Sequence, residues 1–116
     1  MSAFPDFQLD GSNIILAPQG FVATMPFPVK LAIRSGEVLI VLLDIPVGSI
    51  ENENVFGIRP DGTTAWQIER LPHVYDDSPY TNITITDGEV KAYNWDGDEV
   101  VLDPATGKSI GVSYKK

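Results

Sequence analysis

Turn signals recur at such short intervals in this chain that little room is left between them for helices. Glycine and proline together make up 19 of the 116 residues. Apolar residues do not recur at the three-to-four spacing of an amphipathic helix over any stretch of ten residues. The intervals between turns are instead rich in valine, isoleucine and threonine, which favour β-strands. The sequence therefore predicts an all-β protein.

The turns are of the kinds that connect β-hairpins. Glycine reaches positive φ without strain, so a Gly step between two short strand-like segments predicts a tight reversal. Such steps are Ser35-Gly36, Asp61-Gly62, Asp87-Gly88, Asp96-Gly97 and Thr106-Gly107. We expect about nine to eleven short, mostly antiparallel strands in a hairpin meander, within one domain that spans residues 1–116. The meander forms either two packed sheets or a rolled, barrel-like sheet, and it is too short for a complete β-propeller.

One segment stands out by its hydrophobicity. Residues 38–43 are six consecutive aliphatic side chains, whereas apolar and polar or small residues alternate over 29–34. Alternation is typical of a strand with one buried face, and an unbroken apolar run is typical of a strand covered on both faces. We therefore expect 38–43 to form the central strand of the core.

Two segments resemble each other at an offset of 35 residues, namely 55–62 and 90–97. Each has a valine, a small residue two positions later, a large apolar residue next, and an Asp-Gly step at its end. Such a similarity arises either from an internal repeat or by chance between two hairpins.

Residues 54–66 and 100–108 also resemble hairpins of the quinoprotein-type (PQQ-like) β-propeller repeat. In that family a strand ends in a small-apolar-Asp stretch, an Asp-Gly or Thr-Gly turn follows, and a tryptophan closes the next strand. Trp66 matches the closing position, whereas the second copy has Val112 or Tyr114 there. The resemblance implies a β-meander and a binding scaffold, and it carries over no quinone cofactor and no dehydrogenase activity.

Charge and composition exclude several partners. The chain has 16 acidic and 8 basic residues, a net charge of −8, and no cysteine. Nucleic acid and anionic membranes would be repelled by such a surface, because the few lysines and arginines are scattered. Disulfides and thiolate chemistry are excluded outright. The first residues lack the basic and apolar regions of a signal peptide, so we expect a cytoplasmic protein.

No catalytic constellation emerges from the sequence. His73 is the single histidine and lies beside a proline without a nucleophile elbow, so a surface role is expected rather than a catalytic triad. Residues 94–99 resemble a calcium loop but lack the later ligands of an EF-hand, which favours a hairpin turn. We therefore expect no metal and no cofactor, and a non-enzymatic protein is favoured over an enzyme.

Aromatic residues beside acidic turns are the best binding candidates, because rings provide contact area and carboxylates provide charge. These candidates are His73, Tyr75, Asp76, Asp77, Tyr80, Trp95, Asp96 and Asp98. Trp66 and Tyr93 are expected in the core instead.

Three functions agree with these observations. The leading hypothesis is a small non-enzymatic binding protein with an acidic surface, which neutralises or scaffolds a basic protein partner. The second is a structural module that self-associates through its sheet edges. The third is a carboxylate-dependent protein that binds or cleaves glycans.

Overall fold

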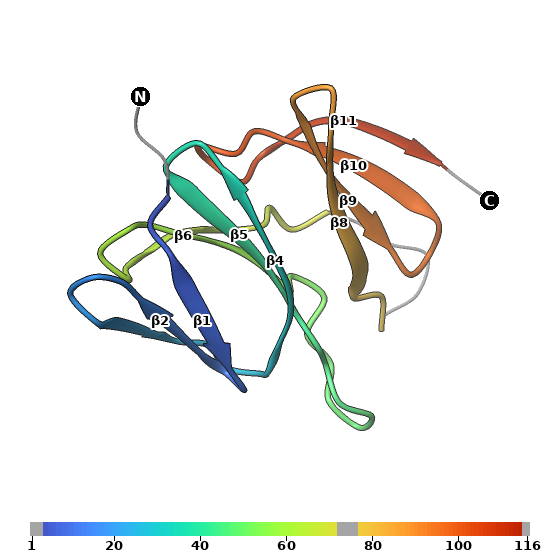
Figure 1. The fold of residues 1–116 in the computed structure, drawn as a ribbon. Coiled ribbons are helices and arrows are strands. Elements are labelled where there is room, and N and C mark those ends of the chain that lie inside the picture. The colour runs from blue at the N-terminus through green and yellow to red at the C-terminus, as the bar shows by residue number, and fades with distance from the viewer. Residues whose placement is uncertain (1–3, 72–76, 115–116) are drawn as a thin grey trace.

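The computed structural model describes residues 4–71 and 77–114, which form eleven β-strands (Figure 1). The first sheet contains β1 (Phe7–Asp10), β2 (Asn13–Leu16) and β3 (Phe21–Thr24). The second contains β4 (Val29–Ser35), β5 (Val38–Leu43), β6 (Val55–Ile58) and β7 (Thr64–Gln67). The third contains β8 (Tyr80–Thr86), β9 (Glu89–Asn94), β10 (Asp98–Leu102) and β11 (Ser109–Tyr114). Over the described residues there is no helix that could cross a membrane.

Each sheet is an antiparallel meander of consecutive strands, which confirms the predicted fold class. The hairpin turns lie at the predicted glycine steps. Two details differ from the expectation. The strands form three separate sheets rather than two or one rolled sheet, and β1 was not anticipated. The signal for β1 was present, because the turn after it begins with Asp10-Gly11, and Gly11 has a φ of 58°.

The second sheet lies between the other two, and its strand β5 is buried on both faces as predicted. Alternate residues of β5 point to opposite faces. Leu39, Val41 and Leu43 pack in the cluster shared with the first sheet. Ile40 and Leu42 pack in the cluster shared with the third sheet. The unbroken apolar run therefore joins two hydrophobic cores, one on each side of β5.

Two side chains connect the second sheet to the third. The indole ring of Trp66, on β7, lies against both Gly57 and Gly107, and neither position leaves room for a Cβ atom. The indole Nε1–H of Trp66 donates a hydrogen bond to the carbonyl of Pro104 at 2.8 Å. Asn54, which precedes β6 and is 1% exposed, bonds the backbone of Tyr80 at the start of β8. The predicted core position of Trp66 is confirmed.

The similarity between residues 55–62 and 90–97 does not correspond to equivalent places in the fold. The first segment begins on β6, the third strand of its sheet, whereas the second begins on β9, the second strand of its sheet. The two hairpins likened to a propeller repeat, β6–β7 and β10–β11, do both join the third and fourth strands of a sheet. The topology thus favours chance for the 35-residue offset.

Candidate binding groove

Three of the eight predicted binding residues, His73, Tyr75 and Asp76, lie outside the described residues. The other five lie on two neighbouring segments of the chain. Asp77 and Tyr80 precede and begin β8. Trp95, Asp96 and Asp98 belong to the turn from β9 into β10 and to the first residue of β10.

The turn that carries Trp95 is fixed by side chains that cap backbone groups. The Asn94 Oδ1 atom accepts a hydrogen bond from the Asp96 N–H at 3.0 Å, and the Asp96 Oδ1 atom accepts one from the Asp98 N–H at 3.0 Å. The Asn94 Nδ2 atom donates to the Ser78 carbonyl at 2.8 Å. The Trp95 N–H donates to the Pro79 carbonyl at 3.0 Å. The turn is therefore held firmly against the segment that leads into β8.

This framework leaves the indole of Trp95 in solvent, with 64% of the residue exposed. Trp95 lines an open groove of about 330 Å³ together with Asp77, Pro79 and the loop 45–49. Within that loop the Ser49 N–H donates to the Pro46 carbonyl at 3.1 Å, and Gly48 has a φ of 95°. We call this feature the Trp95 groove.

The loop that forms one wall of the Trp95 groove presents unusually exposed apolar side chains. Val47 is fully exposed, and Ile50, just beyond the lining residues, is 65% exposed. The loop extends away from the sheets after β5, in green at the lower right of Figure 1. The signal that was missed is the presence of aliphatic residues inside a turn bounded by Pro46 and Gly48.

The segments that form the Trp95 groove carry charge of one sign. Residues 44–53, 77–80 and 94–99 together contain seven carboxylates and neither lysine nor arginine. The carboxylates are Asp44, Glu51, Glu53, Asp77, Asp96, Asp98 and Glu99. Not all of them face solvent, because Asp96 and Glu99 are each 8% exposed. Among the residues that line the groove, Asp77 is the one carboxylate, so the groove combines an exposed ring and aliphatic side chains with one acidic side chain and acidic flanking segments.

Tyr80 is a correction to the predicted binding set, because it is 3% exposed and belongs to the core between the second and third sheets. Burial raises the pKa of the Tyr80 hydroxyl, and the negative charges of Glu53 and Asp96 raise it further. Asp96 is a second correction. Its carboxylate caps the turn backbone rather than facing a partner, as the hairpin-turn interpretation of 94–99 predicted.

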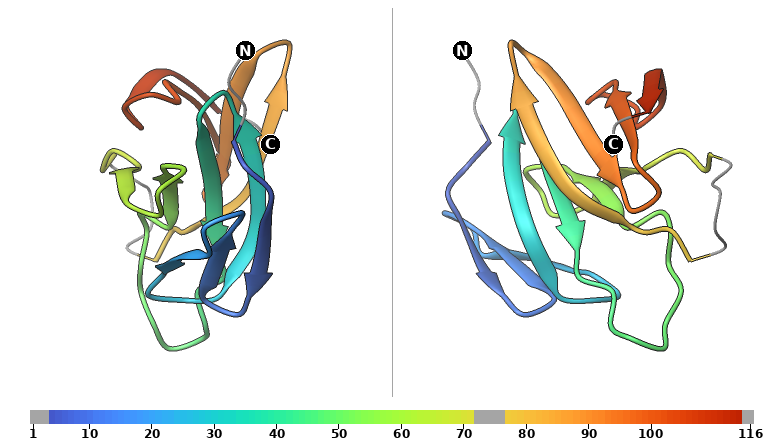
Figure 2. Two further views of the ribbon diagram at one scale, coloured as in Figure 1. Left: turned by 60° about the vertical axis from the view of Figure 1, so that its left-hand side comes forward. Right: turned by 90° about the vertical axis from the view of Figure 1, so that its right-hand side faces the viewer.

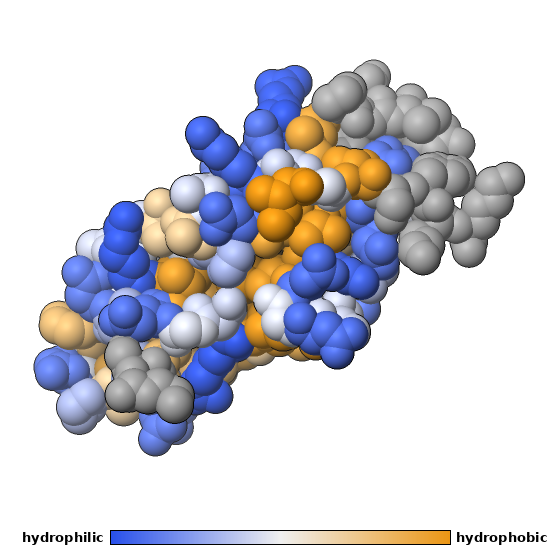
Figure 3. Space-filling view, turned by 90° about the horizontal axis from the view of Figure 1, so that it is seen from above, coloured by the Kyte–Doolittle hydropathy of each residue, from blue (hydrophilic) through white to orange (hydrophobic). Residues whose placement is uncertain are grey.

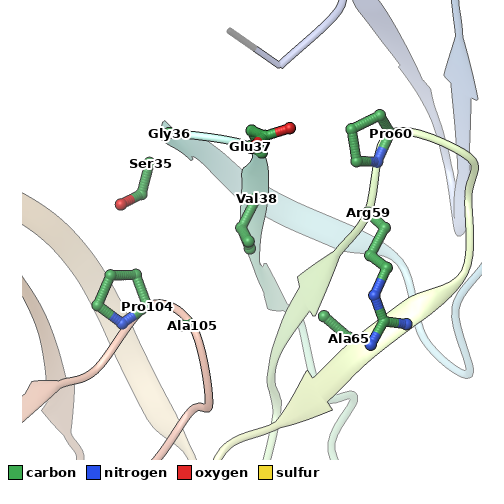
Figure 4. A pocket seen from close by; sticks show the side chains of 9 residues that line it. All are labelled: Ser35, Gly36, Glu37, Val38, Arg59, Pro60, Ala65, Pro104 and Ala105. Atoms are coloured by element: carbon green, nitrogen blue, oxygen red, sulfur yellow. The ribbon is translucent and has the colours of Figure 1, made fainter. Parts of the chain in front are cut away.

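A larger pocket of about 540 Å³ lies where turns of the second and third sheets meet (Figure 4). Val38 and Ala65 of the second sheet face the β10–β11 turn there. Glu37 is the single carboxylate among the lining residues, so this pocket provides no carboxylate pair. The Arg59 Nη1 atom already donates a hydrogen bond to the Thr64 carbonyl at 2.9 Å.

Hydrophobic residues gather in the middle of the molecular face seen from above, with hydrophilic residues around them (Figure 3).

Among residues 4–71 and 77–114, no group of three or more histidine, aspartate or glutamate side chains could hold a metal ion. The described residues of the Trp95 groove present exposed apolar side chains beside Asp77.

Residues 7–114 match DUF7957, a domain of unknown function. The chain belongs to the DUF7957 family. The matched range begins at the first residue of β1 and ends at the last residue of β11, so the DUF7957 domain is the unit of three sheets. No curated protein and no solved structure matches the chain. The resemblance to the quinoprotein-type repeat is therefore not confirmed.

Proposed function

We propose that this DUF7957 protein is a small binding module that takes a basic, partly apolar segment of another protein into the Trp95 groove. The observation that carries the proposal is the 64% exposure of Trp95 on a groove wall opposite an apolar loop. Exposed aromatic and aliphatic side chains that gather in one place are typical of interaction sites.

The charge of the surrounding segments supports a basic partner. Seven carboxylates without a lysine or arginine favour a positively charged segment and disfavour an acidic one. A lysine or arginine of the partner would also gain a cation–π interaction with the exposed indole face. An aliphatic or aromatic anchor would pack against Val47 and Pro79. Neutralising or scaffolding a basic protein are both roles that such a groove serves.

The test uses a displayed library of random peptides. Peptides that bind the wild-type protein are selected, and those that also bind the Trp95→Ala variant are removed. We expect the enriched peptides to contain lysine or arginine next to an apolar anchor. Their affinity should fall at least about tenfold in Trp95→Ala and in Asp77→Lys, and should weaken as salt is added.

Matched controls separate the groove from the rest of the surface. Val22→Ala removes another exposed apolar side chain, on β3, and Glu89→Lys reverses a charge at the start of β9. Neither variant should change peptide affinity by more than about twofold. Enrichment of acidic peptides, or of peptides that bind Trp95→Ala equally well, would overturn the proposal.

A further inference from the structure

The described walls of the Trp95 groove offer no backbone edge to which a partner strand could add. The N–H groups of Ser78 and Tyr80 donate to two asparagine side chains, and Pro79 has no N–H group. The carbonyl groups of residues 78–80 all accept hydrogen bonds from within the protein. The loop 45–49 contains a turn and no strand. Strand addition needs a row of unpaired N–H and C=O groups, so this groove has to recognise its partner through side chains.

One side-chain donor at the groove is left for a partner. Within residues 4–71 and 77–114, the indole Nε1–H of Trp95 has no hydrogen-bond partner. Asp77 is exposed and is the one carboxylate among the lining residues. The other lining residues are apolar or small, and Pro46 and Pro79 are among them. The groove therefore presents one N–H donor and one carboxylate among apolar surfaces.

The size of the Trp95 groove favours a slender partner segment. Its volume of about 330 Å³ is small, whereas an α-helix with its side chains is about 10–12 Å wide. Both panels of Figure 2 show the loop between β5 and β6, in green, extending beyond the strands, so this wall projects from the sheets. An α-helix also pairs its backbone carbonyls internally and leaves none in its middle for the Trp95 Nε1–H. A segment that is thin and has unpaired carbonyls fits the groove better.

We propose that the basic segment bound by the Trp95 groove is proline-rich and adopts a polyproline II helix. This inference rests on the proposed function and specifies the conformation of the partner. A polyproline II helix has no internal hydrogen bonds, so one of its carbonyls accepts the Trp95 Nε1–H while a pyrrolidine ring packs on the indole. An arginine or lysine of the same segment pairs with the Asp77 carboxylate. Because proline fixes the backbone before binding, the segment loses little conformational entropy.

Three peptides of equal length and equal charge test this proposal by isothermal titration calorimetry. The first combines arginine and leucine with proline and adopts polyproline II. In the second, alanine replaces every proline, which favours an α-helix. In the third, glycine and serine replace every proline, which leaves the chain flexible. We expect the proline peptide to bind at least about tenfold more tightly than either of the others.

The indole N–H signals of the two tryptophans report the proposed hydrogen bond in a nitrogen–proton correlation spectrum. The proline peptide should move the Trp95 signal and leave that of Trp66, whose indole donates to the Pro104 carbonyl. Trp95→Phe identifies the Trp95 signal by removing it. Because this variant keeps a ring and loses the donor, it should bind the proline peptide at least about threefold more weakly. The control Val22→Ala should change this affinity by less than about twofold.

The possible failures of this proposal differ from those of the proposed function. Equal or tighter binding of the alanine or glycine–serine peptide overturns the polyproline II proposal, as does failure of the proline peptide to bind or to move the Trp95 signal. The proposed function survives these results if the library selection still enriches basic peptides without proline. Binding of the proline peptide to Trp95→Ala and Asp77→Lys as tightly as to the wild type would overturn both proposals.

Discussion

The side chain of Asn54 pairs with the backbone of Tyr80 in both directions. Its Oδ1 atom accepts the Tyr80 N–H at 2.7 Å, and its Nδ2 atom donates to the Tyr80 carbonyl at 2.9 Å. The same Nδ2 group donates to the Leu43 carbonyl at 2.9 Å. One buried amide thereby joins the end of β5 to the start of β8, and so ties the second sheet to the third.

Replacement of Asn54 by alanine should destabilise the protein strongly. The change leaves buried backbone groups of Tyr80 and Leu43 without these partners, and unpaired buried polar groups cost about 1–3 kcal/mol each. We expect a loss on the order of 3 kcal/mol in the free energy of unfolding, measured by urea denaturation. Asn82→Ala, at an exposed position of β8, is the control and should change stability by less than about 0.5 kcal/mol. Equal effects of the two substitutions would contradict this role for Asn54.

Gly57→Ala should destabilise the contact between the second and third sheets. A Cβ atom at this position would overlap the indole ring of Trp66, which is itself fixed by Gly107 and Pro104. Overpacking of this kind costs about 1–3 kcal/mol. At Gly111 a Cβ atom would lie 4.0 Å from its nearest neighbour, the Cβ atom of Val101. Gly111→Ala is thus the matched control, and thermal unfolding of both variants decides whether the close approach at Gly57 matters.

The two tryptophans should respond differently to a soluble fluorescence quencher. Trp66 is 7% exposed and Trp95 is 64% exposed, so acrylamide should reach Trp95 and leave Trp66 shielded. Trp95→Phe should remove the quenchable part of the emission and change stability by less than about 0.5 kcal/mol. Trp66→Phe should keep the quenchable part and destabilise the protein by about 1–3 kcal/mol, because it loses a hydrogen bond and core volume. Strong quenching in Trp95→Phe would show that the exposures have been assigned to the wrong residues.

Stability should fall in alkaline solution because of Tyr80. The pKa of its hydroxyl is raised above the ordinary value of 10.0, since burial and nearby carboxylates disfavour the phenolate. The folded state then favours the protonated form. The corresponding stability is intact below pH 10.0 and is lost as the pH rises from there toward the folded-state pKa. Urea denaturation from about pH 8 to about pH 11 should show a steeper loss in the wild type than in Tyr80→Phe. Tyr93→Phe, on the half-buried part of β9, should behave as the wild type does.

The sequence indicated the surroundings of some predicted binding residues and not of others, because different interactions fix each side chain. Trp95 was anticipated as a binding candidate because it stands beside an acidic turn, and the structure exposes it. The burial of Tyr80 could not be anticipated, because the pattern of β8 alone does not indicate which face meets the second sheet. Likewise, a carboxylate in an Asp-Gly turn can face solvent or cap the turn, and only the folded arrangement showed that Asp96 caps it.

The sequence by itself determined the β class, most strand positions, the glycine turns and the burial of β5 on both faces. These features follow from backbone preferences and hydrophobic periodicity, which act over a few neighbouring residues. The tertiary structure alone decided how three meanders stack, and that the loop 45–49, Asp77, Pro79 and Trp95 meet in one groove. Those relationships depend on packing and hydrogen bonds between residues far apart in the chain, such as Asn54 and Tyr80, and no local pattern encodes them.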